Sequence, residues 1–265
     1  MNDSLGDRMK LFEGLTESTL MPYLPILARI DGRAFHTLTR SCKKPYDEEF
    51  AEAMQYTAIH LVESFDPLLS YVQSDEISLL FYQKTFLSQM PFGGRVQKLC
   101  SVLASAAAVK FNKVFGSDYE TFDCRVWQVP NKEEVFNYFI WRERDATRNS
   151  ILGAADSLLG HKACQGKNTS ELQEMMFQKG VNWNDYAAHF KRGTYFRKET
   201  RLVESSYYMN LSTSTGFGPP HSGDRLEKPM VPRSFVQGLD LQLSKVLNKE
   251  EVIFDGKPPN YETGS

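Results

Sequence analysis

Two strand-like segments that lie very close together constrain the fold of this chain more than any other feature. They are "LLSYVQS" at residues 68–74 and "ISLLFY" at residues 77–82, and only Asp75 and Glu76 separate them. Parallel strands need a crossover of roughly a dozen residues, so these segments are predicted to form an antiparallel hairpin. Buried strands avoid carboxylates because removing a charge from water is costly. The two acids at the hairpin tip therefore need an explanation.

The segments on either side of the hairpin complete a β-α-β-β-α-β order. Residues 26–32 form an apolar run that ends in Asp-Gly, and residues 122–129 form another strand-like run. Apolar residues at helical spacing predict amphipathic helices at residues 47–65 and 94–114. Their buried faces are predicted to contain Phe50, Ala53, Met54, Thr57, Ala58, Leu61 and Phe65, and Val96, Leu99, Cys100, Leu103, Ala106 and Ala107. This order is typical of the ferredoxin-like α/β (α+β) fold, an antiparallel sheet with two helices on one face.

The rest of the chain is predicted to add helices and then a less regular end. Apolar residues recur at helical spacing after residue 130, whereas Gly, Pro and polar residues dominate from about residue 214. We therefore expect residues 1–130 to form the core and residues 131–213 to form a helical extension that completes it. Residues 214–265 are expected to form an irregular or partly mobile tail.

Composition places the chain among ordinary globular proteins. Its 265 residues are 41% hydrophobic and 24% charged, and the net charge of −2 gives no overall basic field for nucleic acid, although local patches can still bind phosphate. The four cysteines have no metal-ligand spacing and are expected to be reduced thiols. No apolar run reaches the roughly 18 residues of a membrane-spanning helix, and the N-terminus lacks the apolar core of a signal peptide. We expect a cytoplasmic protein without a membrane partner.

Two carboxylates are predicted to meet at neighbouring strand ends. Asp31 closes the first strand and Asp75 lies at the hairpin tip, beside which the first strand runs in the ferredoxin-like order. Converging carboxylates repel each other unless a cation neutralises them, and Mg²⁺ is usually held by one or two carboxylates together with substrate phosphates. Gly32 lets the backbone approach closely and offers its carbonyl as a ligand. The simpler alternative is that these acids are solvated turn residues.

Several motifs in order resemble the tRNA-histidine guanylyltransferase family, which includes the Thg1-like proteins that extend RNA in the 3′-to-5′ direction. The resemblance covers about residues 29–192. It is carried by "RIDGRAFH" (29–36), "KPYD" (44–47), "SYVQSDEISLLF" (70–81), "FDCRVW" (122–127), "FIWRERDATRNSI" (139–151) and a W-x-x-Y…F-x-R-G stretch (183–193). The family has a palm-like catalytic domain similar to those of polymerases and nucleotide cyclases, in agreement with the predicted order.

The resemblance implies a two-metal catalytic centre. Asp31 and Asp75 would each ligate two Mg²⁺ ions, with the Gly32 carbonyl as a further ligand. Glu76 corresponds to a third catalytic acid, which is either a ligand or a residue that orients the ligands. Metal and triphosphate would then compensate the charges of the two acids at the hairpin tip.

The resemblance also implies a binding site for ATP or GTP as activating and substrate nucleotides. Two of its members, Arg95 and Lys98, share a face at a predicted helix start, where the helix dipole favours phosphate. Without the motif context each basic residue is a solvated surface charge, and His36 is as readily a packed histidine. The implied nucleotide-binding residues are Gly32, Arg33, Ala34, Phe35, His36, Lys44, Ser74, Asp75, Arg95 and Lys98.

A tRNA partner is implied by the same family. RNA would be bound through shape, 2′-hydroxyl and phosphate contacts. Because the net charge is slightly negative and the family usually forms tetramers, we expect an RNA site assembled from more than one subunit of a homotetramer. The candidate RNA-binding residues are Arg142, Arg144, Arg148, Asn149, Lys191, Arg192, Arg197 and Lys198.

The implied reaction is nucleotide addition to an activated RNA 5′ end. ATP adenylylates a 5′-monophosphorylated end, and the 3′-hydroxyl of a nucleoside triphosphate then attacks the activated phosphate. Residues 147–150 read Thr-Arg-Asn-Ser, where eukaryotic guanylyltransferases carry His-Ile-Asn-Asn. This departure resembles the Thg1-like branch, in which template-dependent repair of 5′-truncated tRNA is the preferred activity.

Two other functions remain open at this point. The first is a strict tRNA-histidine guanylyltransferase that adds one G before position one. The second is a non-catalytic palm module that binds nucleotide or RNA. A nucleotide cyclase is disfavoured because the hairpin lacks the GG-D/E-F-type signature of such enzymes.

Overall fold

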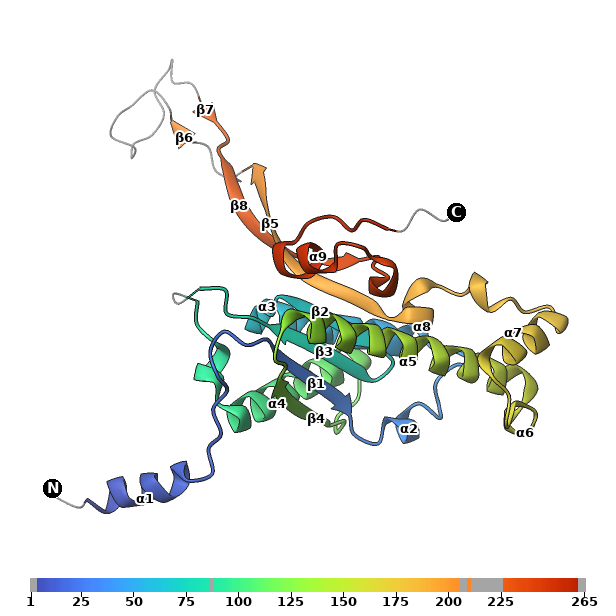
Figure 1. The fold of residues 1–265 in the computed structure, drawn as a ribbon, viewed down its shortest axis with the longest axis horizontal. Helices are drawn as coiled ribbons and strands as arrows, with labels where there is room; N and C mark the ends of the chain where they lie inside the picture. The colour runs from blue at the N-terminus through green and yellow to red at the C-terminus, as the bar shows by residue number, and fades with distance from the viewer. Residues whose placement is uncertain (1–3, 86–87, 205–208, 211–225, 262–265) are drawn as a thin grey trace.

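One six-stranded antiparallel sheet organises the chain in the computed structural model, which describes residues 4–85, 88–204, 209–210 and 226–261 (Figure 1). The strand order is β4-β1-β3-β2-β5-β8, and β6 and β7 form a separate pair. The strands are β1 (Ile26–Gly32), β2 (Leu69–Gln73), β3 (Glu76–Phe81), β4 (Phe122–Gln128), β5 (Thr194–Glu204), β6 (Met209–Asn210), β7 (Leu226–Glu227) and β8 (Met230–Leu239). The α-helices are α1 (Leu5–Gly14), α2 (Phe35–Leu38), α3 (Glu48–Phe65), α4 (Val96–Phe115), α5 (Lys132–Leu159), α6 (His161–Cys164), α7 (Thr169–Gln178), α8 (Ala188–Arg192) and α9 (Lys249–Asp255). Three short 3-10 helices are η1 (Pro91–Gly94), η2 (Trp183–Asp185) and η3 (Leu243–Lys245).

The predicted β-α-β-β-α-β order is confirmed by β1, α3, β2, β3, α4 and β4. The hairpin β2–β3 is antiparallel and pairs Val72 with Ile77. Strand β1 lies between β3 and β4, and it pairs Asp31 with Glu76 on one side and with Asp123 on the other. Residues paired in this way point to the same face of an antiparallel sheet. The acidic positions of three strands are therefore brought together.

Helices α3 and α4 pack on one face of the sheet and build the first core. Helix α3 begins where the Asp47 carboxylate accepts a hydrogen bond from the Phe50 amide (3.0 Å), which caps its N-terminus. The predicted faces are confirmed in large part. Six of the seven α3 residues are buried and Phe65 is half-buried, while Leu99, Leu103 and Ala107 of α4 are buried and the other three residues half-buried.

Helix α5 covers the opposite face and builds the second core. Strand residues that alternate with those of the first core, such as Leu27 and Leu80, meet Phe139 of α5 and Phe254 of α9 there. The C-terminal half of α5 packs with α6, α7 and Trp183 in a third cluster. Helix α5 is long but carries many charged residues, and within the described ranges no helix is both long enough and apolar enough to cross a membrane.

The C-terminal part of the chain corrects the prediction of an irregular tail. Within residues 214–265, β8 pairs with β5 from the Tyr195–Leu239 pair to the Glu204–Met230 pair, and α9 places Val252, Ile253 and Phe254 in the second core. Strand β8 is at the sheet edge, where a proline is tolerated, so the Pro and Gly content that suggested irregular structure is compatible with a strand. Residues 211–225 and 262–265 lie outside the described residues.

A buried carboxylate of α5 anchors this C-terminal segment. Glu143 accepts hydrogen bonds from the amides of Leu243 (2.6 Å) and Ser244 (3.1 Å) and from the Tyr195 hydroxyl (3.0 Å). Burial raises the pKa of Glu143, while the three donors act in the opposite direction. The carboxylate thus joins α5, β5 and η3.

We expect Glu143→Gln to lower the free energy of unfolding by about 2 kcal/mol, because the amide NH₂ would face a donor from which the carboxylate now accepts a hydrogen bond. Urea unfolding followed by circular dichroism measures this change. Glu63→Gln, at an exposed position of α3, serves as the control and should change stability by only a few tenths of a kcal/mol. Equal stability of the two variants would contradict the anchoring role of Glu143.

Candidate active site

The acidic residues predicted from the sequence gather where β1 meets the β2–β3 turn. Asp31 lies near the end of β1, and Asp75 lies in the turn that follows β2. The Gly32 amide donates to the Asp75 carbonyl (3.0 Å), which ties the turn to the end of β1. Ser74 adopts a left-handed backbone conformation (φ 48°), so the chain reverses within two residues. Local backbone geometry thus sets the positions of both aspartates.

The electrostatics of the two aspartates are unfavourable without a cation. The pKa of Asp31 is raised by burial and then by the negative charges of Asp75 and Asp123. Burial also raises the pKa of Asp75, against hydrogen bonds from its own amide and from the Ser74 hydroxyl. Asp123 was missed in the sequence analysis. Asp123 follows the apolar Phe122 in β4, and successive side chains of a strand point to opposite faces of the sheet. This alternation was the signal that could have placed Asp123 on the same face as Asp31.

The donor set of this corner fits a hard divalent cation. Carboxylate and carbonyl oxygens are the ligands that Mg²⁺ prefers. A Cβ atom at position 32 would lie 2.5 Å from the ring of Phe35, so only glycine fits there. In the described parts of the chain, no three His, Cys, Asp or Glu side chains cluster tightly enough to hold a metal by themselves. An ion bound by Asp31 and Asp75 would need further oxygen ligands, such as substrate phosphates.

Glu76 differs from Asp31 and Asp75 because it has a cationic partner of its own, Arg142. It is buried and receives two hydrogen bonds of 2.8 Å, from Nε and Nη2 of Arg142 on α5. Arg29 Nε lies 3.9 Å from the same carboxylate, and the Ser78 hydroxyl donates to it at 3.4 Å. Burial raises the pKa of Glu76 and the charge of Arg142 opposes this effect. The geometry favours an orienting role over direct metal ligation.

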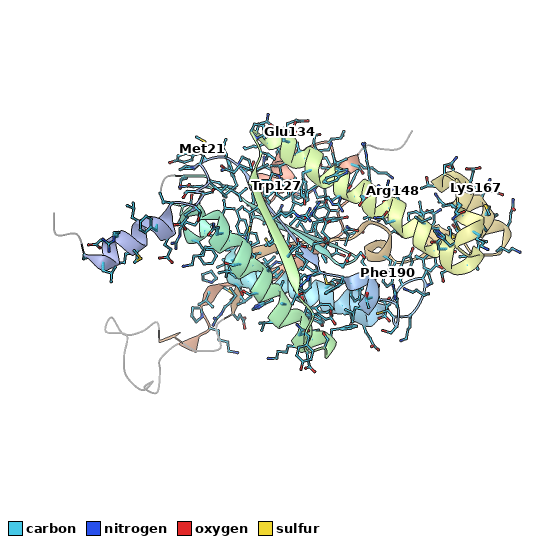
Figure 2. All side chains as sticks on the ribbon, turned by 90° about the horizontal axis from the view of Figure 1, so that it is seen from below. Met21, Trp127, Glu134, Arg148, Lys167 and Phe190 are labelled. Carbon is cyan, nitrogen blue, oxygen red and sulfur yellow. The ribbon has the colours of Figure 1, made fainter. Side chains whose placement is uncertain are left out.

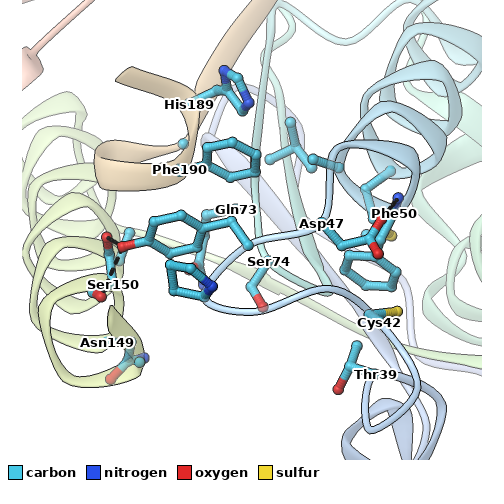
Figure 3. A pocket seen from close by; sticks show the side chains of 18 of the residues that line it. Thr39, Cys42, Asp47, Phe50, Gln73, Ser74, Asn149, Ser150, His189 and Phe190 are labelled. Carbon is cyan, nitrogen blue, oxygen red and sulfur yellow. Dashed lines mark hydrogen bonds between the residues drawn. The ribbon is translucent and has the colours of Figure 1, made fainter. Parts of the chain in front are cut away.

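A cavity of about 270 Å³ opens beside the hairpin turn (Figure 3). It is bounded by the loop before α3, by the end of β2, by α5 and by α8. Tyr46 forms part of its wall: the ring stacks on Phe190 with centroids 4.7 Å apart, and its hydroxyl donates to the Ser150 carbonyl (2.9 Å). Polar residues that line the cavity are Thr39, Lys43, Lys44, Asp47, Gln73, Ser74, Asn149, Ser150 and His189.

The predicted nucleotide-binding residues lie in different environments. Lys44 and Ser74 both line the cavity, and Lys44 Nζ donates to the Thr39 carbonyl (2.8 Å). Phe35 is 1% exposed and packs among aromatic rings of the first core, so its side chain is not available to contact a base. Arg33, Ala34 and His36 are exposed around it, and Gly32 is buried.

Arg95 and Lys98 do lie at a helix start, because α4 begins at Val96. Arg95 Nε forms an ion pair with Glu17 (3.5 Å), and Lys98 Nζ lies 5.7 Å from the centre of the Phe92 ring. Neither side chain lines the cavity beside the hairpin turn.

Two of the predicted RNA-binding residues need correction. Arg142 and Arg197 are 5% and 8% exposed, because Arg142 binds Glu76 and Arg197 donates to the Val252 and Ile253 carbonyls. A sequence gives no sign that an arginine is buried, and these two cannot form a surface for RNA.

The remaining candidates for RNA binding are at least partly accessible. Arg144, Arg148 and Asn149 are exposed on α5, and Asp145 accepts hydrogen bonds from Arg148 (2.7 Å) and Asn149 (3.3 Å). Asp145 also accepts from the buried Arg142 (3.1 Å). Lys191, Arg192 and Lys198 are half-buried at the end of α8 and in β5.

An α+β palm-like domain with carboxylates at the end of β1 and in the following hairpin is the arrangement expected of an enzyme of the nucleotidyltransferase class. Comparison with known proteins agrees. The family described as tRNAHis guanylyltransferase (Thg1) matches residues 6–130. A bacterial tRNA(His) guanylyltransferase (Thg1)-like protein solved in complex with ATP is 41% identical, with a TM-score of 0.71 over 74% of this chain and 89% of that one.

Two further relatives support the same assignment. A bacterial Thg1-like protein in complex with GTP is 36% identical, with a TM-score of 0.69 over 88% of this chain and 91% of that one. The probable tRNA(His) guanylyltransferase of Drosophila melanogaster is 28% identical over 75% of each chain. The chain belongs to the tRNA(His) guanylyltransferase (Thg1) family.

Proposed function

We propose that this enzyme repairs the 5′ ends of truncated tRNAs by template-dependent 3′-to-5′ nucleotide addition. A 5′-monophosphate would attack the α-phosphate of ATP and release pyrophosphate, which leaves an adenylylated end. The 3′-hydroxyl of an incoming nucleoside triphosphate would then attack that phosphate and release AMP. The observation that carries the proposal is the pair Asp31 and Asp75, brought together where β1 meets the β2–β3 turn, with Ser74 of the same turn lining the cavity. Similarity to bacterial proteins solved with ATP and with GTP supports it.

Asp31, Asp75 and the Gly32 carbonyl would hold two Mg²⁺ ions. Bound there, the ions would supply charge neutralisation for the phosphates and would lower the pKa of the attacking hydroxyl. Glu76 would act as a positioning residue, since its carboxylate is held by Arg142 directly opposite Asp31 in the β1–β3 register. Positioning and charge stabilisation contribute most of the catalysis in phosphoryl transfer.

The cavity would hold part of a nucleotide. Ser74, the neighbour of Asp75 in the turn, lines it together with Lys44, and Asn149 lines it from α5. The exposed Arg33 and His36 would contact the triphosphate or base from the loop after β1, and Arg95 and Lys98 would meet phosphate oxygens at the start of α4. One of the residues that depart from His-Ile-Asn-Asn, Ser150, lines the same cavity and would therefore lie next to the nucleotide.

The RNA would reach this centre from the exposed side of α5. Arg144 and Arg148, with Lys191, Arg192 and Lys198, would contact phosphates, and a homotetramer in the cytoplasm would supply further contacts from neighbouring subunits. The names of the eukaryotic relatives favour strict addition of G to tRNA(His) as the second candidate. Intact Asp31 and Asp75 argue against a non-catalytic module, which would have no need for two costly carboxylates.

The test is single-nucleotide extension of 5′-monophosphorylated tRNA that lacks its first nucleotide, with ATP, Mg²⁺ and each of the four nucleoside triphosphates. Repair predicts addition of only the nucleotide that pairs with the opposing base, and exchange of that base should change the product accordingly. Addition of G to every template, together with addition to full-length tRNA(His), would instead establish the strict guanylyltransferase. A lack of any product would favour the binding module.

A further inference from the structure

An exposed tryptophan lies next to the candidate catalytic centre without a role in the arrangement described so far. Trp141 of α5 is 52% exposed, although tryptophan is highly buried on average. The guanidinium of Arg142 lies 4.4 Å from the centre of its ring. The same guanidinium makes both 2.8 Å hydrogen bonds to Glu76. The side chain of Arg142 therefore links the indole of Trp141 to Glu76, which pairs with Asp31 between β1 and β3.

The indole of Trp141 is held by a row of aromatic rings. Its edge meets Tyr138 with centroids 6.0 Å apart, and Tyr138 meets Trp127 of β4 at 5.3 Å. The Tyr138 hydroxyl shares a 2.7 Å hydrogen bond with Ser78 of β3. Figure 2 shows Trp127 on β4 beside α5. A ring fixed in this way loses little conformational entropy when it stacks on a ligand.

Further cationic side chains lie on α5 and on strands of the sheet that α5 covers. Arg144 and Arg148 follow Trp141 by three and seven residues, so all three share a side of α5. On the sheet below, Arg29 of β1 pairs in register with Arg125 of β4. The buried Nε of Arg29 has no hydrogen-bond partner among the described residues, and it lies 3.9 Å from the Glu76 carboxylate. An aromatic face bordered by cations is the combination with which proteins bind single-stranded nucleic acid and nucleotides.

We propose that Trp141 is a stacking platform for a nucleobase. Arg142 covers part of the indole, and the exposed part of the ring would receive the base, while the arginines around it would hold phosphate. The platform rests on the proposed function, because it deepens the same site. The base can belong to the RNA end or to a nucleoside triphosphate. Stacking is the same chemistry in both cases, and the experiment separates the two sources.

Tryptophan fluorescence reports the contact directly. The chain has three tryptophans, so a Trp127→Phe and Trp183→Phe variant leaves Trp141 as the only one. Its emission is measured during titration with 5′-truncated, 5′-monophosphorylated tRNA, and separately with each nucleoside triphosphate. We expect saturable quenching, and the titration in which it occurs identifies the source of the base. A lack of quenching in both titrations would overturn the proposal.

Binding affinity provides the second test, in the otherwise unchanged protein. We expect Trp141→Ala to raise the dissociation constant of the quenching ligand about tenfold and Trp141→Phe to raise it much less, since phenylalanine still stacks. Tyr56→Ala is the matched control, because Tyr56 is 51% exposed and lies on α3, across the sheet. Trp141→Phe also covers the case in which the alanine variant fails to fold.

The outcomes also separate the platform from the enzymatic activity. If Trp141→Ala binds RNA and nucleotides as Tyr56→Ala does, the platform is wrong, whatever the enzyme adds to tRNA. If quenching is saturable but the unmodified enzyme adds no nucleotide, the platform stands and the proposed repair activity fails.

Discussion

Replacement of Asp75 by alanine is expected to lower the rate of nucleotide addition by roughly 10³-fold or more, because one carboxylate that would hold both metal ions is lost, and such ions contribute several kcal/mol of charge stabilisation. The fold should survive, since the turn is held by the hydrogen bond from the Gly32 amide to the backbone carbonyl of residue 75, which does not involve the side chain. Single-turnover extension of 5′-monophosphorylated tRNA measures the loss of activity.

The control for this experiment is Asp240→Ala, which removes an exposed aspartate after β8. It should leave the rate within about twofold of the unmodified enzyme. Substitutions of exposed residues away from the core and the active site usually change the free energy of unfolding by only about ±0.5 kcal/mol. Circular dichroism of Asp75→Ala should match that of the unmodified protein. Normal nucleotide addition by a folded Asp75→Ala variant would exclude Asp75 as a metal ligand and would remove the main support for the proposed mechanism.

The second large effect concerns the pair between Glu76 and Arg142. We expect Arg142→Met to lower the free energy of unfolding by about 3–5 kcal/mol, because it leaves the Glu76 carboxylate buried without its bidentate partner. Arg148→Met is the matched control on the same helix; its guanidinium is exposed and should contribute less than about 1 kcal/mol. Urea unfolding of both variants measures the difference.

A double variant makes this test sharper. Glu76→Gln combined with Arg142→Met removes both charges, so it should recover part of the stability that Arg142→Met loses alone. Activity should stay low in the double variant if Glu76 positions the site, because the carboxylate opposite Asp31 is then absent. If Arg142→Met is no less stable than Arg148→Met, the pair does not hold β3 and α5 together.

The first core was predictable from the sequence because its signals are local. The spacing of Phe50, Ala53 and Met54 is a property of one helix, and the short gap between β2 and β3 fixes their antiparallel pairing. The proximity of Asp31 and Asp75 could be predicted because the ferredoxin-like order places their strands side by side. These predictions needed only the periodicity of each segment, which can be read within about twenty residues, and the order of the segments along the chain.

The parts that were missed depend on contacts between distant segments. Arg142 and Arg197 look like surface cations, and only Glu76 and the carbonyls of α9, remote in sequence, explain their burial. Strand β8 was not predicted because its partner β5 lies across a long stretch of chain and because an edge strand tolerates Pro232. The cavity could not be predicted either, since its walls come from four separate regions.

The way in which the second core is assembled has a consequence for synthesis of the protein. Most of the first core has been made once β4 is made, and only Phe196 of β5 among its buried residues comes later. Leu27 and Leu80 on the opposite face are covered by Phe139 of α5 and by Ile253 and Phe254 of α9, which are made after β4. A nascent chain on the ribosome therefore carries a sheet whose second apolar face is incompletely covered from the time β4 is made until α9 is made. We expect this interval, rather than the finished fold, to be the stage at which the protein depends most on chaperones.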